Sequence, residues 1–305
     1  MPKVAVIGSG NVGATLAMRV LESGIADVVM LDIVEGVCRG KAMDLTDAAA
    51  VLKHGCAITP TVDYKEIAGS QVVVITAGFP RLPGMSREEL VLKNSGIVKE
   101  AVRNIKAYAA DSIIIVVTNP LDVMAHIAYH ESGFARGRVL GMAGVLDTAR
   151  FVALIAEELA VLPKDIEAYV IGSHGDTMIP VVSQTKVKGK PLTEVLSGDK
   201  IAAIVQRTKN RGAEIVGLLK SGSAYYAPSA SAFHMVKAVI NDTREVMCVS
   251  CPLEGEYGLR DICVGVPARI GRNGLEKVIE IPLAAAEEAG FKESAQAIRT
   301  TIGKI

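Results

Sequence analysis

Among the five histidines of this 305-residue chain, one lies in a setting that suits chemistry. His174 stands in the segment Gly172-Ser-His-Gly-Asp-Thr177, which predicts a loop rather than a helix or strand. An imidazole ionises close to neutral pH, so a histidine held in such a loop can take up and return a proton. His174 is therefore the candidate general acid/base. The other histidines lie in helical or helix-end patterns and are interpreted as structural: His54, His126, His130 and His234.

A carboxylate and a guanidinium stand close together upstream, in Asp147-Thr-Ala-Arg150. This segment predicts the start of a helix, where Asp147 is a suitable N-cap residue. Arg150 then lies about one turn further along the helix. Capping alone would explain the aspartate, so the residues leave a structural and a functional interpretation open.

Arg81 and Arg87 occupy an irregular segment that contains proline and glycine. The segment follows an apolar strand predicted at 71–76, so it leaves the carboxyl end of that strand, where parallel sheets bind their ligands. Arginine can bind a carboxylate through two parallel hydrogen bonds. The alternative is a solvated loop whose arginines bind nothing, and the residues alone favour neither interpretation.

The elements that position these residues begin with an apolar strand at 4–7, which runs into Gly8-Ser-Gly-Asn-Val-Gly13 and then a helix. This order is typical of a dinucleotide-binding loop. Gly8 permits the sharp turn, Gly10 lets the backbone approach a pyrophosphate, and Gly13 lets the helix pack closely. The other members of this predicted cofactor-binding loop are Ser9, Asn11 and Val12.

Asp32 ends the next predicted strand, 28–31, about 20 residues beyond the glycines. Its carboxylate can accept hydrogen bonds from the adenosine ribose and would repel a 2′-phosphate. Neither Ile33 nor Val34 supplies a positive charge to neutralise such a phosphate. The sequence therefore predicts NAD rather than NADP.

Strands and helices alternate through the first half of the chain, which predicts an α/β fold with a doubly wound parallel sheet. The predicted strands are 4–7, 28–31, 56–59, 71–76, 112–117 and 139–140, and the predicted helices are 11–23, 36–53, 88–110 and 122–131. The second half lacks this alternation and predicts a mixed α+β unit, with strand-like segments at 166–171 and 178–187 and antiparallel strands at 245–250 and 262–270. We expect a nucleotide-binding domain at 1–144 and a substrate domain at 145–305.

Composition excludes several classes of partner. Lysine and arginine balance aspartate and glutamate, so neither nucleic acid nor an anionic membrane is expected. No apolar stretch approaches membrane-spanning length, and an early strand leaves no room for a signal peptide. An odd number of cysteines, five, favours reduced thiols and a cytosolic location. Cys248 and Cys251 lie on opposite faces of a predicted strand and are interpreted as buried thiols.

Several segments together resemble the lactate/malate dehydrogenase family, and their order and spacing fit along essentially the whole chain. They are Gly8-Ser-Gly-Asn-Val-Gly13, Thr76-Ala-Gly-Phe-Pro-Arg-Leu-Pro-Gly-Met-Ser-Arg87, Val117-Thr-Asn-Pro120, Gly144-Val-Leu-Asp-Thr-Ala-Arg150 and Gly172-Ser-His-Gly-Asp176. The resemblance implies an N-terminal Rossmann fold, NAD as cofactor and the oxidation of a small 2-hydroxy acid. No metal site is expected.

The resemblance also implies roles for individual residues. His174 is the general acid/base, and Asp147 orients its imidazole and stabilises its charge. Arg150 holds the carboxylate next to the reacting carbon. Arg87 polarises the substrate carbonyl, and Asn119 hydrogen-bonds the same oxygen.

Within the family the chain most resembles the bacterial members that act on malate. Arg81 stands at the position where lactate enzymes carry glutamine, so a dicarboxylate substrate is expected. The cofactor is lined by Asn94, Val117, Thr118 and Asn119. The segment 79–89 resembles the family's mobile lid.

Three other functions are alternatives to malate oxidation. A lactate dehydrogenase is the closest alternative, and Arg81 disfavours it. An NAD-dependent glycosidase is disfavoured because it would need a metal site. A non-catalytic NAD sensor is disfavoured because it would not need the group His174, Asp147, Arg150 and Arg87. A homodimer or homotetramer is expected from the resemblance, with the apolar helix around 42–52 as a candidate contact face.

Overall fold

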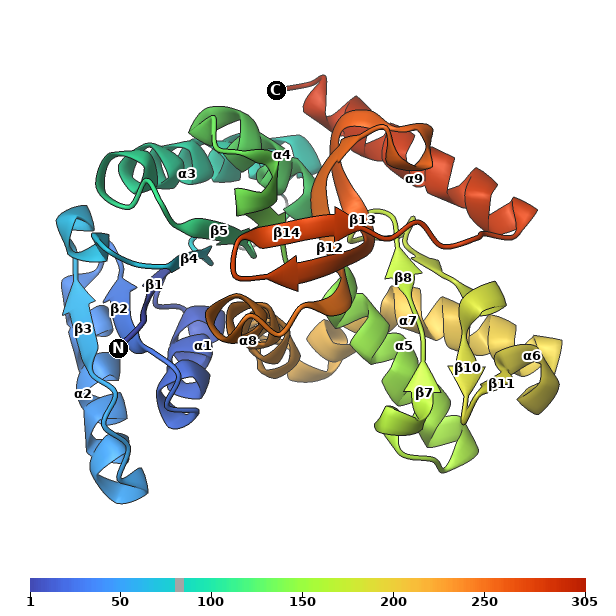
Figure 1. The fold of residues 1–305 in the computed structure, drawn as a ribbon, viewed down its shortest axis with the longest axis horizontal. Coiled ribbons are helices and arrows are strands. Elements are labelled where there is room, and N and C mark those ends of the chain that lie inside the picture. Colours follow the sequence, from blue (N-terminus) through green and yellow to red (C-terminus); the bar gives the residue numbers. More distant parts are fainter. Residues whose placement is uncertain (80–84) are drawn as a thin grey trace.

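The computed structural model describes residues 1–79 and 85–305, and its largest sheet has nine strands (Figure 1). The strand order is β14-β13-β12-β6-β5-β4-β1-β2-β3. Arg81 lies outside the described residues, and so does the side chain of Arg87. The predictions made for these two arginines therefore stay predictions.

The first half of the chain contributes the parallel part of this sheet, as predicted. The pairs β1–β2, β1–β4, β2–β3, β4–β5 and β5–β6 are all parallel. Every residue of β4 and β5 is buried, as expected for strands covered on both faces. The strands are β1 (Lys3–Ile7), β2 (Asp27–Leu31), β3 (Ile58–Thr61), β4 (Val72–Ile75), β5 (Ile113–Val116) and β6 (Val139–Gly141).

Helices connect these strands and cover the sheet: α1 (Asn11–Glu22), α2 (Glu35–Leu52), α3 (Arg87–Tyr108) and α4 (Leu121–Ser132). The start of α3 is fixed by a capping box. Ser86 Oγ accepts a hydrogen bond from the Glu89 N–H at 3.0 Å, and Glu89 Oε2 accepts one from the Ser86 N–H at 2.9 Å. The end of α4 is set by Gly133, whose φ of +62° suits glycine.

The second half continues the same sheet, which the sequence does not predict. β12 (Glu245–Glu254) pairs antiparallel with β6 through Ser250 opposite Gly141. It also pairs with β13 (Arg260–Gly271), which confirms the predicted antiparallel strands. β13 continues into a hairpin with β14 (Gly274–Val278), which the sequence does not predict because only two of its five residues, Leu275 and Val278, have large apolar side chains.

A smaller lobe is built on α5 (Gly144–Leu159) and α7 (Gly198–Leu219), which share a second hydrophobic core. The strands predicted at 166–171 and 178–187 are wrong, because the chain there breaks into short pieces. Ile166 pairs with Val187, whereas Ile171 pairs with Ile179 in a different sheet, so neither segment runs as a single strand. The pieces are β7 (Ile166–Glu167), β8 (Val170–Ile171), β9 (Ile179–Pro180), β10 (Lys186–Val187), β11 (Lys190–Pro191) and α6 (Leu192–Val195).

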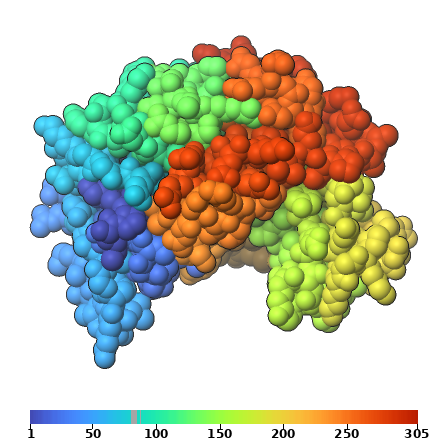
Figure 2. Space-filling view, in the orientation of Figure 1, coloured from blue at the N-terminus to red at the C-terminus, as the bar shows by residue number. Residues whose placement is uncertain are grey.

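Two further helices complete the molecule, α8 (Tyr226–Asn241) and α9 (Ala285–Ile302). Figure 2 shows α8 in the middle of one face, between the first-half helices and the smaller lobe. All five cysteines are buried and free, and Cys248 and Cys251 lie on β12 as interpreted from the sequence. Within the described ranges, no helix combines the length and apolar composition needed to cross a bilayer.

Candidate active site

The glycine loop after β1 has the geometry of a phosphate cradle. Gly8 has a φ of +103°, and a Cβ atom at Gly13 would lie 1.9 Å from the Gly8 carbonyl oxygen, so neither position accepts a side chain. A Cβ atom at Gly10 would meet nothing within 4 Å, so the space in front of the loop is open. Gly10 is the N-cap of α1 and offers no side chain to the first N–H groups. These groups and the helix dipole therefore fit the pyrophosphate of a dinucleotide.

Asp32 lies directly behind this loop. Its Oδ2 accepts hydrogen bonds from the Ser9 N–H at 2.6 Å and from Ser9 Oγ at 2.7 Å, and its Oδ1 accepts one from the Val34 N–H at 3.1 Å. Burial raises the pKa of Asp32, but these hydrogen bonds outweigh it and lower the pKa below the usual value. The carboxylate is therefore charged at neutral pH and fixes the loop, a role that the sequence does not predict.

Lys41 of α2 is a second residue that sequence reasoning missed. Its Nζ donates a hydrogen bond to the Ser9 carbonyl oxygen at 2.6 Å. The glycine loop is thus held on one side by a carboxylate and on another by an ammonium. The helical position of Lys41 gives no local signal of this contact.

Replacement of Asp32 by asparagine should weaken the preference for NADH over NADPH by about tenfold or more, since hydrogen bonds to charged groups contribute about 1.5–3 kcal/mol. Asparagine can still accept from the Ser9 N–H but carries no charge to repel a 2′-phosphate. Fluorescence titration with NADH and NADPH measures both dissociation constants. An unchanged ratio would show that the charge of Asp32 does not select the cofactor. Asp32→Ala, which also removes the support of the loop, should bind both cofactors more weakly than Asp32→Asn.

The loops after β4 and β5 are tied together by Asn94 of α3. Its Oδ1 accepts from the Phe79 N–H at 2.7 Å, and its Nδ2 donates to the carbonyl oxygens of Phe79 at 3.2 Å and Asn119 at 2.7 Å. Thr118 adds a hydrogen bond from Oγ1 to the Ala77 carbonyl oxygen at 2.7 Å. Asn94 and Thr118 thus position the loops beside the glycine cradle, while Asn119 itself is exposed there and Val117 is half-buried.

His174 and Asp147, far apart in the sequence, meet in the structure. His174 Nδ1 lies 2.8 Å from Asp147 Oδ2, and the two side chains are 16% and 3% exposed. Burial lowers the pKa of His174, but the charge of Asp147 and this hydrogen bond outweigh it and raise the pKa above 6.5. Because Nδ1 faces Asp147, Nε2 is the ring nitrogen that is chemically able to exchange a proton with a bound molecule.

Asp147 does not cap α5, so the capping interpretation is wrong. The helix begins at Gly144, with Ala143 as its N-cap, and Asp147 lies inside the first turn. The early start depends on glycine, because a Cβ atom at Gly144 would lie 2.4 Å from the Cβ of Cys248. The aspartate is thereby turned toward His174 rather than toward the end of its own helix.

The loop that carries His174 is held from several elements, and the sequence gives no sign of these contacts. The His174 N–H donates to Asp122 Oδ2 at 2.7 Å, and the Ser173 N–H donates to Ser294 Oγ of α9 at 2.8 Å. Gly172 and Gly265 of β13 exchange backbone hydrogen bonds at 2.9 and 3.1 Å. Burial raises the pKa of Asp122 to about 6, although the hydrogen bond from His174 opposes this rise.

Arg150 completes the group around Asp147. Its Nη1 lies 3.4 Å from Asp147 Oδ1, and its side chain is 12% exposed. Burial lowers the pKa of Arg150, and Asp147 offsets this only in part. Its Nε is buried and has no hydrogen-bond partner in the part of the chain that the structure describes. A buried donor of this kind beside a proton-transfer pair fits a site for a substrate carboxylate.

The segment that contains Arg81 is held at the residues on either side of it that the structure describes. Phe79 is held by Asn94, as above, and Ser86 caps α3. The Phe79 end lies just beyond β4, at the edge of the sheet that also carries the glycine loop after β1. The guanidinium groups of both arginines lie outside the described residues.

The fold and the site define a class of protein, an oxidoreductase that binds a dinucleotide and contains a buried His–Asp pair. Residues 2–141 match the NAD binding domain of the lactate/malate dehydrogenase family, and residues 144–305 match its alpha/beta C-terminal domain. The chain belongs to the lactate/malate dehydrogenase family. Its cofactor is NAD.

Proteins similar to this chain agree with its assignment to the family. A malate dehydrogenase of Trichormus variabilis is 49% identical over 302 residues, which cover 99% of this chain and 93% of that protein. The structure of a malate dehydrogenase from Salinibacter ruber matches with a TM-score of 0.94 and 43% identity, covering 99% and 97% of the two chains. A lactate dehydrogenase from Cryptosporidium parvum, complexed with lactic acid and the cofactor, matches with a TM-score of 0.96 and 38% identity, covering 99% and 97%.

Proposed function

We propose that the chain catalyses the reversible, NAD-dependent oxidation of malate to oxaloacetate. The observation that carries this proposal is the buried His174–Asp147 pair beside Arg150, whose Nε lacks a partner among the described residues. It is supported by relatives named malate dehydrogenase that are 49% identical over nearly the whole chain.

In the proposed reaction, His174 takes the proton from the malate hydroxyl while its imidazole is neutral, and returns it in the reverse direction. Asp147 stabilises the imidazolium that forms between these steps. Arg150 binds the carboxylate next to the reacting carbon, and Asn119 and Arg87 donate to the oxygen of that carbon. When bound, NAD supplies the hydride acceptor, and the protein supplies placement.

The fold does not separate malate from lactate, because a lactate dehydrogenase matches the chain as well as a malate dehydrogenase does. The substrate assignment depends instead on Arg81, which can pair with a second carboxylate. Pyruvate offers a methyl group at that point and would leave the arginine unpaired.

The test of this function is an NADH-oxidation assay with oxaloacetate and pyruvate side by side. We expect a kcat/KM that favours oxaloacetate by about 10²–10⁴-fold, the range that one unpaired buried charge corresponds to. A preference for pyruvate would identify a lactate dehydrogenase. Tight NADH binding without turnover of either acid would identify a non-catalytic NAD-binding protein.

We also propose that the protein is a homo-oligomer of the cytosol. The helix α2, which forms part of the projection at one end of the molecule in Figure 2, exposes apolar side chains, and Met43 and Val51 are 66% and 79% exposed. Such a face on a helix suits contact with a second copy of the chain. Light scattering at micromolar concentration distinguishes a monomer from a dimer or tetramer.

A further inference from the structure

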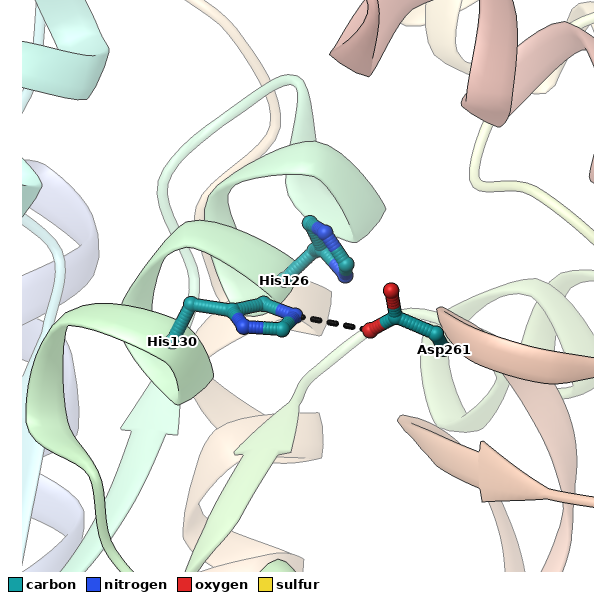
Figure 3. A group of neighbouring side chains, drawn as sticks. All are labelled: His126, His130 and Asp261. Atoms are coloured by element: carbon teal, nitrogen blue, oxygen red, sulfur yellow. Dashed lines mark ion pairs between the residues drawn. The ribbon is translucent and has the colours of Figure 1, made fainter.

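Three side chains of types that commonly bind metals meet beside α4, at a place that includes neither His174 nor Asp147 (Figure 3). His126 and His130 lie one turn apart on that helix, and Asp261 comes from β13. The ligand atoms of all three lie within 4.8 Å of one another. His130 Nε2 lies 2.9 Å from Asp261 Oδ1, and the two imidazole centroids are 4.3 Å apart.

The backbone at Asp261 is shaped to present its side chain. Leu253 pairs with Ile262 and Glu254 with Arg260, so Asp261 is the extra residue of a β-bulge. Its φ of +52° is in the left-handed region, which is unfavourable for a residue with a Cβ atom. Bulges re-aim side chains, and strained backbone of this kind is concentrated at functional sites. The carboxylate points toward the two histidines in Figure 3.

His126 is in a suitable state to be a ligand. Its Nδ1 is buried and has no hydrogen-bond partner among residues 1–79 and 85–305. This nitrogen is therefore available for a ligand that these residues do not supply. Unpaired buried nitrogens in proteins are commonly satisfied by an ordered water or an ion.

We propose that His126, His130 and Asp261 bind a divalent transition-metal ion of the Zn²⁺ type. Two imidazole nitrogens and one carboxylate oxygen suit Zn²⁺, Co²⁺ or Ni²⁺, whereas Mg²⁺ and Ca²⁺ prefer oxygen ligands alone. Bonds of about 2.0–2.2 Å place tetrahedral ligand atoms about 3.4 Å apart, so a pair of ligand atoms at the 4.8 Å limit has to approach by about 1.4 Å. The side chains of His130 and Asp261 are 50% and 74% exposed and can make this movement by rotation.

The sequence interprets both histidines as structural, because their third partner lies far along the chain. A metal at this point would link α4 to the bulge of β13. These two elements also carry Asp122 and Gly265, which hold the His174 loop. The ion would contact neither His174 nor Asp147, so its main effect is on stability rather than on turnover.

The test is calorimetric titration of the chelator-treated, full-length protein with Zn²⁺. We expect one site per chain, and we expect the separate variants His130→Ala and Asp261→Asn to bind Zn²⁺ at least about tenfold more weakly, since even outer-shell changes cost 10–100-fold. Asparagine tolerates the left-handed backbone at position 261, so that variant preserves the bulge. Zn²⁺ at about 100 times Kd should raise the thermal unfolding midpoint of the parent protein by about 4 °C.

A matched control is His234→Ala. His234 Nε2 lies 3.1 Å from Glu245 Oε2, so this variant removes a surface histidine–carboxylate pair that is outside the proposed site. It should bind Zn²⁺ as the parent does. The buried thiols compete little, because burial raises the pKa of every cysteine.

Three outcomes would overturn the proposal. The first is the absence of Zn²⁺ binding to the parent, and the second is unchanged affinity in both His130→Ala and Asp261→Asn. The third is binding that His174→Gln abolishes and His130→Ala preserves, which would place the ion at the catalytic pair. Oxaloacetate reduction by the metal-free variants reports whether they are folded.

Discussion

Replacement of His174 by glutamine is expected to lower kcat by about 10²–10⁴-fold in both reaction directions, the range attributed to general acid/base catalysis. Glutamine can hydrogen-bond the substrate oxygen but cannot exchange a proton with it at neutral pH. The loop should keep its position, because Asp122 accepts from the backbone N–H of residue 174 and not from its side chain. Stopped-flow and steady-state assays with oxaloacetate and with malate measure the loss.

The NADH dissociation constant serves as the folding control for this variant, since the glycine cradle does not involve His174. His234→Gln is the matched substitution at an exposed histidine and should retain the parent's kcat. If His174→Gln retained kcat within tenfold of the parent, proton transfer would have to be assigned to another group.

The variant Asp147→Asn extends this prediction to the pH dependence. Asp147 raises the pKa of His174 above its usual 6.5, and burial opposes it. Without this charge the main effect that raises the pKa is lost, while burial and Arg150 still lower it and only Asp122 opposes them, so the pKa falls. Malate oxidation needs the neutral imidazole, so its rate rises with pH through this pKa, and in the variant the rise should move to lower pH with a lower plateau. If the acidic limb of the pH profile of kcat/KM stayed at the same pH in Asp147→Asn, Asp147 would not be the group that raises the pKa of His174.

Replacement of Arg81 by glutamine is expected to lower the oxaloacetate-to-pyruvate ratio of kcat/KM by about 10²–10⁴-fold. The ratio falls because kcat/KM decreases for oxaloacetate and increases for pyruvate. In the proposed complex, oxaloacetate loses the partner of its second carboxylate, and pyruvate no longer leaves a guanidinium unpaired; a charge left buried and unpaired costs about 3–5 kcal/mol. Because Asn94 holds Phe79 and the cap at Ser86 fixes the start of α3, the change should not disturb the His174 pair.

Arg103→Gln is the control for the loss of a positive charge. Arg103 pairs with Glu131 at 2.7 Å on the surface and is 68% exposed, so its replacement should leave the substrate ratio unchanged. The same assay with both acids serves both variants. A ratio in Arg81→Gln equal to that of Arg103→Gln would remove the main support for a dicarboxylate substrate.

Parts of this structure could be predicted because they depend on local patterns. The apolar strands β4 and β5 and the glycine loop are defined by residues adjacent in sequence, and the parallel sheet follows from them. The juxtaposition of His174 and Asp147 is not local, and family resemblance, rather than spacing, predicted it.

The contacts that the sequence did not predict are long-range or depend on close packing. Ser294 and Asp122 reach the His174 loop from distant helices, and no pattern around either residue marks that contact. The capping alternative for Asp147 fails because α5 begins three residues earlier than predicted, which depends on the space around Gly144. Asp261 is aimed by a bulge whose existence depends on the register between β12 and β13.

The sheet that both halves share has a consequence for the integrity of the chain. A fragment that ended after β6 would present that strand as an open edge, with its backbone groups ready to pair with any other extended chain. The contact between β6 and β12 also leaves little room for a larger side chain, since a Cβ atom at Gly141 would lie 2.9 Å from the Cβ of Ser250. The nucleotide-binding half therefore depends on the remainder of the chain for protection against aggregation as well as for its catalytic partner.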